Sequence, residues 1–471
     1  MVCAVYAAVT RGIWLDEFWS LRLGNPGVPL FDAVDRLWLG DTNPFGANLL
    51  YRLAVGTGVR DIGALRVILS VPATLLFLAG TAIFSRSSPA RDPFYLVMAM
   101  LVVALPAFVA TFGDFRIYHW QLCAVAVCLQ AAYRIMVEGS AAPLGRVATI
   151  LALVAVVAAL SLHFVAGFLV AAAIAPMLLH LVRLRRWRTA TAIALAAALA
   201  GSATFIMAVI QYGRISQTVD ASWIETTTLD AMLMMAGALS APFLANPAAA
   251  AVALVVPRAP PGDRRTFVLV IAAGVVLGGA LLTGINAVRP VIVDRYLVPW
   301  QPAMCAILAA AIARSLRCGW RLYMVAGCCA LSIAVTTVRQ SREVGWKGTR
   351  DFIASTVRRC PATRVYAISP WRLRNTRDSR AANLERPVFV EAYQRLARNA
   401  GFAVAFVPDA LRVLDVPAAC PLLVWIEHSG GRRLGDAASL LGQARLGFVQ
   451  PVRVSRFATD DGIVLVAVRN D

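Results

Sequence analysis

Long apolar runs recur through most of the chain and indicate its structural class. A helix needs about 17–25 apolar residues to cross a bilayer, and ten segments of this kind occur between residues 62 and 338. They are 62–84, 93–111, 117–134, 147–163, 164–182, 189–211, 231–256, 267–287, 297–313 and 321–338. The pattern predicts a mainly α-helical, multi-pass transmembrane protein.

Residues 1–12 are also apolar but are too short to span a bilayer unaided. Two interpretations stay open, a first helix that is cut short and a segment that inserts shallowly. Residues 1–12 lack the basic N-terminal region and the small-residue cleavage site of a signal peptide. We count them as an eleventh span, so the prediction is about eleven helices, the first one short.

The last part of the chain has a different pattern. Apolar runs there shrink to strand length, and helix-like stretches at 391–400 and 435–446 lie among them. The strand-length runs are Arg364–Ser369, Phe402–Val407, Leu422–Glu427 and Ile463–Val468. This pattern of short apolar runs and helix-like stretches is typical of a small α/β domain. We therefore predict two domains, a transmembrane domain at 1–338 and an α/β domain at 339–471.

Composition agrees with this class, because 59% of residues are hydrophobic and only 15% are charged, which excludes a soluble globular enzyme of this size. The net charge of +19 comes from 44 Arg and one Lys against 26 acids. With a cytoplasmic N-terminus, the inside loops carry fourteen Arg and three acids, and the opposite loops carry eight Arg and eleven acids. This distribution satisfies the positive-inside rule. The positive charge is therefore explained mainly by the membrane topology, and it implies no nucleic-acid partner.

The same topology places the first loop, 13–61, and the tail, 339–471, on the periplasmic side of an inner membrane. The tail has a net charge of +9, which fits either anionic lipid headgroups or a solvated basic surface. Cys360 and Cys420 are its only cysteines, and a disulfide persists outside the cytosol. They are the candidate disulfide pair, with two free thiols as the alternative. No Cys-x-x-Cys, P-loop or Gly-x-Gly-x-x-Gly motif indicates zinc or nucleotide binding.

The sharpest local motif is Trp14-Leu15-Asp16-Glu17-Phe18-Trp19-Ser20, directly after the first apolar segment. Its simpler interpretation is an aromatic belt with two hydrated acids. Three further polar motifs are predicted at the same membrane face, and two of them combine an acid, an Arg and a Tyr. They are Asp41-Thr42-Asn43-Pro44, Phe112-Gly113-Asp114-Phe115-Arg116-Ile117-Tyr118 and Val293-Asp294-Arg295-Tyr296-Leu297-Val298-Pro299.

Taken in this order, the motifs resemble those of the GT-C membrane glycosyltransferases. The branch they resemble uses dolichyl- or polyprenyl-phosphate sugars and includes protein O-mannosyltransferases and aminoarabinose transferases. The resemblance covers roughly residues 1–338, and the tail matches loosely through Trp346-Lys347-Gly348-Thr349-Arg350-Asp351. It implies a transferase that takes a sugar from a polyprenyl-phosphate carrier, with inversion at the anomeric carbon.

The resemblance carries the catalytic acid over to Asp16, with Glu17 beside it. A carboxylate can take the acceptor's proton or anchor a cation, so a divalent cation at Asp16 stays open, and no cofactor is certain. Arg116 and Arg295 are candidates for a clamp on the leaving phosphate, because a guanidinium contacts two phosphate oxygens at once. Tyr118 and Tyr296 would donate hydrogen bonds. The alternative for these residues is snorkelling arginines with interface tyrosines.

Four further residues are candidates with open roles. Asp114 stands where the family commonly has a Glu, and is either a second acid or the partner of Arg116. His163 is a candidate for binding phosphate or metal, or is an interfacial histidine bonded to backbone. Asp41 and Asn43 replace a stretch that usually carries His-Pro, and are candidates for acceptor contact or structural support.

The predicted function is transfer of a sugar from a polyprenyl-phosphate-linked donor at the periplasmic face. A glycolipid, lipopolysaccharide, polysaccharide or protein would be the acceptor. One rival is a transporter or flippase of an anionic glycolipid or polysaccharide. Transporters tend to have internal repeats and charges near mid-membrane, whereas this sequence shows no visible repeat and its charges gather at one face. A non-catalytic assembly subunit is the other rival.

Overall fold

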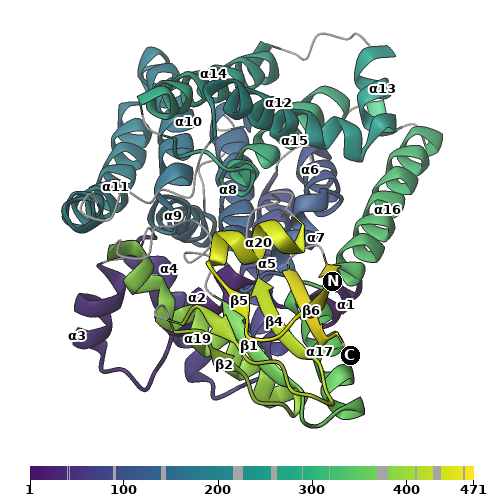
Figure 1. Ribbon diagram of the computed structural model, residues 1–471. Coiled ribbons are helices and arrows are strands. Elements are labelled where there is room, and N and C mark those ends of the chain that lie inside the picture. The colour runs from purple at the N-terminus through teal and green to yellow at the C-terminus, as the bar shows by residue number, and fades with distance from the viewer. Residues whose placement is uncertain are drawn as a thin grey trace. The chain divides into compact units, whose positions relative to one another are not determined.

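The structure, a computed structural model, divides into two compact units. The first comprises Met1–Val9, Leu23–Arg214 and Trp223–Gln340, and the second Thr10–Arg22, Ile215–Ser222 and Ser341–Asp471. The first is helical and the second is α/β (Figure 1). The residues that the structure describes are 1–39, 41, 43–88, 92–138, 145–215, 226–255, 262–288, 290–313, 315–317, 319–368, 380–408, 411–427, 436–459 and 462–470.

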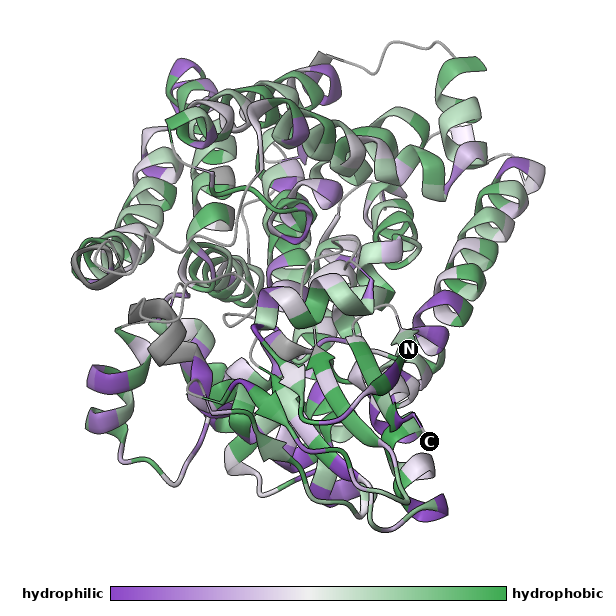
Figure 2. Ribbon diagram, viewed as in Figure 1, coloured by the Kyte–Doolittle hydropathy of each residue, from purple (hydrophilic) through white to green (hydrophobic). Residues whose placement is uncertain are grey.

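Each of the ten predicted spans corresponds to a helix or to a pair of helices in the helical unit, and these helices are apolar along most of their length (Figure 2). The elements that build most of this unit are α1 (Val2–Thr10), α3 (Leu30–Ala33), η1 (Val34–Trp38), α4 (Phe45–Gly56), α5 (Ile62–Ser87), α6 (Phe94–Val103), α7 (Pro106–Phe112), α8 (Tyr118–Tyr133), η2 (Arg134–Glu138), α9 (Arg146–Ser161), α10 (Phe164–Arg183), α11 (Trp187–Ile215), α12 (Thr228–Ala245), α13 (Pro247–Val255), α14 (Gly262–Val288), η4 (Asp294–Trp300), α15 (Gln301–Ile312), η5 (Ser315–Arg317) and α16 (Gly319–Arg342).

Six of the described helices are long and apolar enough to cross a membrane, or up to seven if the bent pair α6 and α7 is one span. Two segments predicted as single helices are broken. Segment 93–111 bends by 62° between α6 and α7, where Pro106 begins the second helix, and segment 231–256 breaks at Asn246, before Pro247. Proline lacks the N–H of a helix interior and clashes with the preceding turn, so each helix ends before it.

Helix α8 lies in the core of the helical unit, and almost all of its residues are buried. Beyond the end of α8 that is far from Tyr118, buried ion pairs join Arg134 to Glu138 and Arg264 to Asp92. Tyr133 donates to Asp92 over 2.8 Å, and Phe94 stacks on Tyr133 at a ring separation of 3.6 Å. Because removing one partner would leave a buried charge unpaired, this network fixes how α6, α8 and α14 pack.

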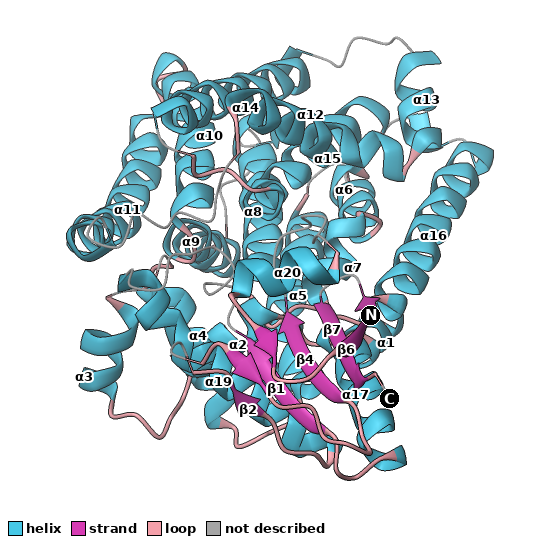
Figure 3. Cartoon of the chain, viewed as in Figure 1, coloured by secondary structure: helices cyan, strands magenta, loops and turns pink. Residues whose placement is uncertain are grey.

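The α/β unit contains a five-stranded sheet in the order β2-β1-β4-β7-β6, drawn in magenta in Figure 3. The first three strands are parallel, and β7 and β6 are antiparallel to their neighbours. The elements are α2 (Leu15–Leu23), α17 (Trp346–Arg359), β1 (Arg364–Ile368), α19 (Arg380–Ala400), β2 (Ala405–Phe406), β3 (Val413–Leu414), β4 (Leu422–Glu427), α20 (Ala437–Ala444), β5 (Gly447–Phe448), β6 (Val452–Thr459) and β7 (Gly462–Arg469).

The four predicted strands form in this unit, and the alternation of β4 explains how its sheet is covered. Leu422, Val424 and Ile426 pack with Leu440 of α20. Trp425 points to the other face, where its ring meets Tyr393 of α19 at 4.9 Å. Strand β6 was missed, because an edge strand alternates apolar residues with arginines.

Cys360 and Cys420, the pair named from the sequence, form a disulfide in the structure. Their Cα atoms are 5.8 Å apart, and 60 positions separate them along the chain. The bond links the end of α17 to the residues just before β4. It therefore joins an element that covers the sheet to one of the strands within it.

Candidate active site

Three aromatic rings from distant parts of the sequence meet in the helical unit. Tyr118 begins α8, His163 precedes α10, and Tyr296 lies in the 3₁₀-helix η4. The centroid of the His163 ring lies 4.4 Å from that of Tyr296 and 5.8 Å from that of Tyr118, and the two tyrosine rings are 6.2 Å apart. We call these three residues the ring cluster. They are three of the five residues predicted to bind the donor phosphate.

The other two predicted phosphate ligands, both arginines, lie over this cluster. The guanidinium carbon of Arg116 is 5.7 Å from the centroid of the Tyr118 ring, and that of Arg295 is 5.8 Å from the centroid of Tyr296. Both arginines are near enough to His163 to interact with it electrostatically. Aromatic faces attract cations, so the rings hold two guanidinium groups in a setting suited to an anion.

Two polar atoms of the ring cluster are buried, and within the described part of the chain they have no hydrogen-bond partner. They are the hydroxyl oxygen of Tyr118, a residue 1% exposed, and Nδ1 of His163, a residue 4% exposed. A buried polar atom left unsatisfied costs about 1–3 kcal/mol. Such groups in a native structure call for an explanation, and a ligand that bonds to them would supply one.

Two further buried side chains, both amides, were not predicted from the sequence. Gln121 lies one turn after Tyr118 on the same side of α8, and Asn48 lies on α4. Both side chains are fully buried, and neither amide has a partner among the residues described. Helix α4 packs closely on the end of α9, because a Cβ on Gly46 would lie 2.9 Å from the carbonyl oxygen of Ser161. An amide side chain within an apolar span is the signal that could have identified Gln121.

Asp41 and Asn43 lie in the same helical unit and stabilise the first loop. The Asp41 carboxylate accepts bonds from the backbone N–H and the amide of Asn43, over 3.2 and 3.1 Å. Gln211 of α11 then donates to the carbonyl oxygens of Trp38 and Asn43, over 2.8 and 3.0 Å. The role of Gln211 was not predicted, since it joins positions 168 residues apart along the chain.

The two acids beside the arginines differ in their surroundings. Asp114 is half-buried in the turn between α7 and α8, where its N–H donates to the carbonyl oxygen of Thr111 over 3.3 Å. Asp294 is exposed, and its carboxylate accepts from the backbone N–H of Arg295 over 2.7 Å. The carboxylate of Asp294 thus bonds to the backbone at the start of η4.

The acidic motif lies in the α/β unit, where Asp16 and Glu17 begin α2. The Glu17 carboxylate is buried and accepts a bond from the N–H of Trp14 over 3.2 Å. A side chain that reaches back in this way stabilises the start of a helix. Asp16 is half-buried, and its carbonyl oxygen accepts from the Ser20 hydroxyl over 3.1 Å. The bond to Trp14 therefore gives the Glu17 carboxylate a structural role at the start of α2.

The segment before α2 is bound to the segment before α17 by backbone contacts that the sequence did not reveal. Gly12 donates to the carbonyl oxygen of Glu343 over 2.9 Å, and Trp346 donates to that of Ile13 over 3.0 Å. A Cβ on Gly12 would lie 1.9 Å from the carbonyl oxygen of Val344, so only glycine fits there. We call the contacts between residues 11–13 and 343–346 the glycine clasp.

Side chains strengthen the glycine clasp on both sides. Arg11 forms an ion pair with Glu343 over 2.9 Å. The ring of Phe18 in α2 lies 5.5 Å from the buried indole of Trp346, which in turn lies 5.5 Å from the ring of Tyr393. The predicted boundary at residue 338 assigns Asp16 to the transmembrane domain, yet its nearest structural support comes from the α/β unit.

The described residues do not contain a metal centre of ordinary composition. No group of three or more His, Cys, Asp or Glu side chains among them is arranged to hold an ion. Asp16 and Glu17 supply two carboxylates, and one of these already bonds to the backbone of Trp14. No chemical step is assigned to a divalent cation here.

Comparison with known structures identifies the fold. The crystal structure of ArnT from Cupriavidus metallidurans in the apo state has a TM-score of 0.55 and 12% sequence identity, covering 99% of this chain and 96% of that one. The structure of the same protein bound to undecaprenyl phosphate has a TM-score of 0.53 and 12% identity, with the same coverage. No protein-family model and no curated protein sequence matches the chain. The expected GT-C fold, mainly helical with a small C-terminal sheet, is confirmed.

Proposed function

We propose that this protein is a membrane glycosyltransferase that moves a sugar from a polyprenyl-phosphate-linked donor to an acceptor at the periplasmic face of the inner membrane. The observation that carries the proposal is the ring cluster with Arg116 and Arg295 over it. Two of its buried polar atoms have no hydrogen-bond partner in the described chain. A phosphate group would bond to both and neutralise both arginines. The undecaprenyl phosphate bound in ArnT supports a ligand of this class.

The leaving phosphate determines what the ring cluster must do. The bond between the anomeric carbon and the phosphate oxygen breaks, and its electron pair stays on that oxygen. Arg116 and Arg295 would offset the new negative charge, and the Tyr118 hydroxyl would donate to a phosphate oxygen. Donors that are already oriented toward developing charge lower the barrier most, because they need no reorganisation during the reaction.

Asp16 would act on the acceptor. As the acceptor oxygen or nitrogen bonds to the anomeric carbon, its proton passes to the Asp16 carboxylate. Attack opposite the departing phosphate inverts the anomeric configuration, as the GT-C resemblance implies. Glu17 would keep α2 in place through its bond to Trp14. A glycolipid, a lipopolysaccharide, a polysaccharide or a protein can each supply the attacking group.

A deletion strain provides the test, because the missing sugar identifies donor and acceptor together. We expect mass spectrometry of its envelope lipids and glycans to show the loss of one sugar. The wild-type chain should restore that sugar, and the Asp16→Asn variant, made at normal levels, should not. Asp32→Asn is the matched control, since Asp32 is a half-buried acid of the same predicted loop.

Two results would refute the proposal. One is an unchanged set of envelope glycans, and the other is full restoration by Asp16→Asn. Lipid flipping by the purified chain in proteoliposomes, unaffected by Asp16→Asn, would instead support the transporter.

A further inference from the structure

A second site lies in the helical unit, in a cavity of about 710 Å³. Its walls come from α8, η2, α9, α10, α11, α14, η4 and α15, and most of the lining residues are small or aliphatic. The first residue of α8 that lines it is Val125, two turns beyond Tyr118. No residue of the ring cluster lines the cavity.

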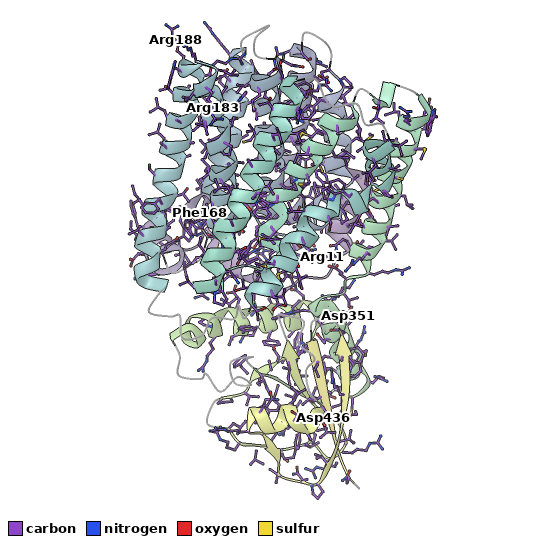
Figure 4. The ribbon with its side chains drawn as sticks, turned by 90° about the horizontal axis from the view of Figure 1, so that it is seen from above. Arg11, Phe168, Arg183, Arg188, Asp351 and Asp436 are labelled. Atoms are coloured by element: carbon purple, nitrogen blue, oxygen red, sulfur yellow. A yellow bond between two sulfur atoms is a disulfide. The ribbon has the colours of Figure 1, made fainter. Side chains whose placement is uncertain are left out.

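The polar lining of the cavity is dominated by arginines. Arg134, Arg186 and Arg188 all line it, together with Thr149 and Thr189. Arg188 and Arg183 lie near the same end of the helices in Figure 4, and Phe168 lies further along α10 from them. Because the remaining walls are hydrocarbon, the cavity is amphipathic, with guanidinium groups on one part of its surface and an apolar interior.

The turn between α10 and α11 positions two of these arginines. Arg185 adopts a left-handed conformation with φ 57°, and the N–H groups of Arg185 and Arg186 donate to the carbonyl oxygens of Val182 and Leu181, both over 2.9 Å. This is the Schellman pattern of a helix end. Arg186 also donates from Nη1 to the carbonyl oxygen of Ile135 over 2.7 Å. Since a guanidinium has five N–H groups, others remain for an anion.

Arg134 provides an independent sign of a ligand. Its side chain is 2% exposed, and its two Nη groups bond to Glu138 and to the carbonyl oxygen of Ser87. Its Nε atom makes no such bond. That atom is buried and has no hydrogen-bond partner within the described ranges. Two of the acids near this end are already paired, Glu138 with Arg134 and Asp92 with Arg264.

We propose that this cavity binds one anionic phospholipid from the leaflet at its arginine-bearing end. One acyl chain would occupy the apolar interior, and the phosphate would lie between Arg186 and Arg188, within reach of the Nε of Arg134. Charge complementarity selects an anionic headgroup over a zwitterionic one. The proposal does not depend on sugar transfer, because the cavity and the ring cluster share no residue.

The test measures retention of phosphatidylglycerol and phosphatidylethanolamine, offered in equal amounts, by native mass spectrometry of the purified full-length chain. We expect wild type to keep one phosphatidylglycerol. The pair Arg186→Gln and Arg188→Gln should weaken that binding about tenfold or more, because each arginine near an anionic headgroup contributes roughly 1 kcal/mol. The control pair Arg146→Gln and Arg183→Gln removes the same charge from exposed residues that do not line the cavity.

A second pair of variants tests the cavity rather than the charge. Ala196 lines it, whereas Ala198 is exposed on the other side of α11. We expect Ala196→Trp to displace the lipid and Ala198→Trp to retain it, both in monodisperse protein. Equal losses in the two arginine pairs, or retention of phosphatidylethanolamine as strongly as phosphatidylglycerol, would overturn the proposal. So would stoichiometric replacement of phosphatidylglycerol by added polyprenyl phosphate.

Discussion

The ring cluster of the helical unit and the acidic motif of the α/β unit are built in opposite ways. The ring cluster gathers side chains from three distant segments and leaves two buried atoms unsatisfied within the described chain. The acidic motif is one continuous segment, and backbone bonds of the glycine clasp hold it in place. The first arrangement brings together side chains of separate elements around two buried atoms that a ligand would satisfy, whereas the second is held by bonds to the backbone. We therefore expect changes at the ring cluster and its two arginines to alter lipid binding, and changes at the acidic motif to alter the rate of transfer alone.

The largest expected effect separates these two roles. Asp16→Asn keeps the shape of the side chain and removes the base, so the rate of sugar transfer should fall about 10²–10⁴-fold. Binding of polyprenyl phosphate should stay unchanged, because the ring cluster is intact. Single-turnover transfer and equilibrium binding would be measured on the same purified sample. A variant that transfers sugar at the normal rate would remove Asp16 from the mechanism.

Arg116→Gln should have the complementary effect. It removes a charge over Tyr118, and the loss of one donor to a developing anion typically lowers kcat about 10²–10³-fold. Unlike Asp16→Asn, it should also weaken the binding of polyprenyl phosphate, because the same guanidinium holds the product. Titration with that lipid would measure the difference. Unchanged affinity would mean that Arg116 is an interfacial arginine, which is the alternative read from the sequence.

Gly12→Ala tests the glycine clasp. The added Cβ would overlap the carbonyl oxygen of Val344, so residues 11–13 must shift and carry Asp16 with them. A misplacement of about 1 Å can cost roughly 10²-fold in rate, and we expect a loss of ten- to a hundredfold in kcat with unchanged lipid binding. Gly442→Ala is the matched control, because a Cβ on that helical glycine meets nothing within 4 Å. Equal activity of the two variants would show that the clasp does not position Asp16.

The sequence predicted much of the fold because apolar length and proline position are local properties. Ten helical segments and four strands follow from them, and Pro106 explains the one bend of 62°. The order of the motifs likewise identified the three residues of the ring cluster and the two arginines over it. The glycine clasp could not be predicted, since it depends on an approach between Gly12 and Val344 that no local pattern records. The same holds for Asn48, whose lack of a described partner is a property of packing.

The smallest expected effect tests most directly whether a ligand satisfies the buried polar atoms of the ring cluster. Tyr118→Phe keeps the ring and removes a buried hydroxyl that has no described partner, so the free energy of unfolding without ligand should stay level or rise. Binding of polyprenyl phosphate should weaken about three- to tenfold, because one hydrogen bond contributes roughly 0.5–1.5 kcal/mol. Thermal unfolding with and without that lipid would show both effects. Tyr366→Phe, in strand β1 of the other unit, should leave the lipid-induced shift in Tm unchanged. If Tyr118→Phe destabilised the ligand-free protein and left binding intact, the hydroxyl would be structural, and the contrast between the two regions would be lost.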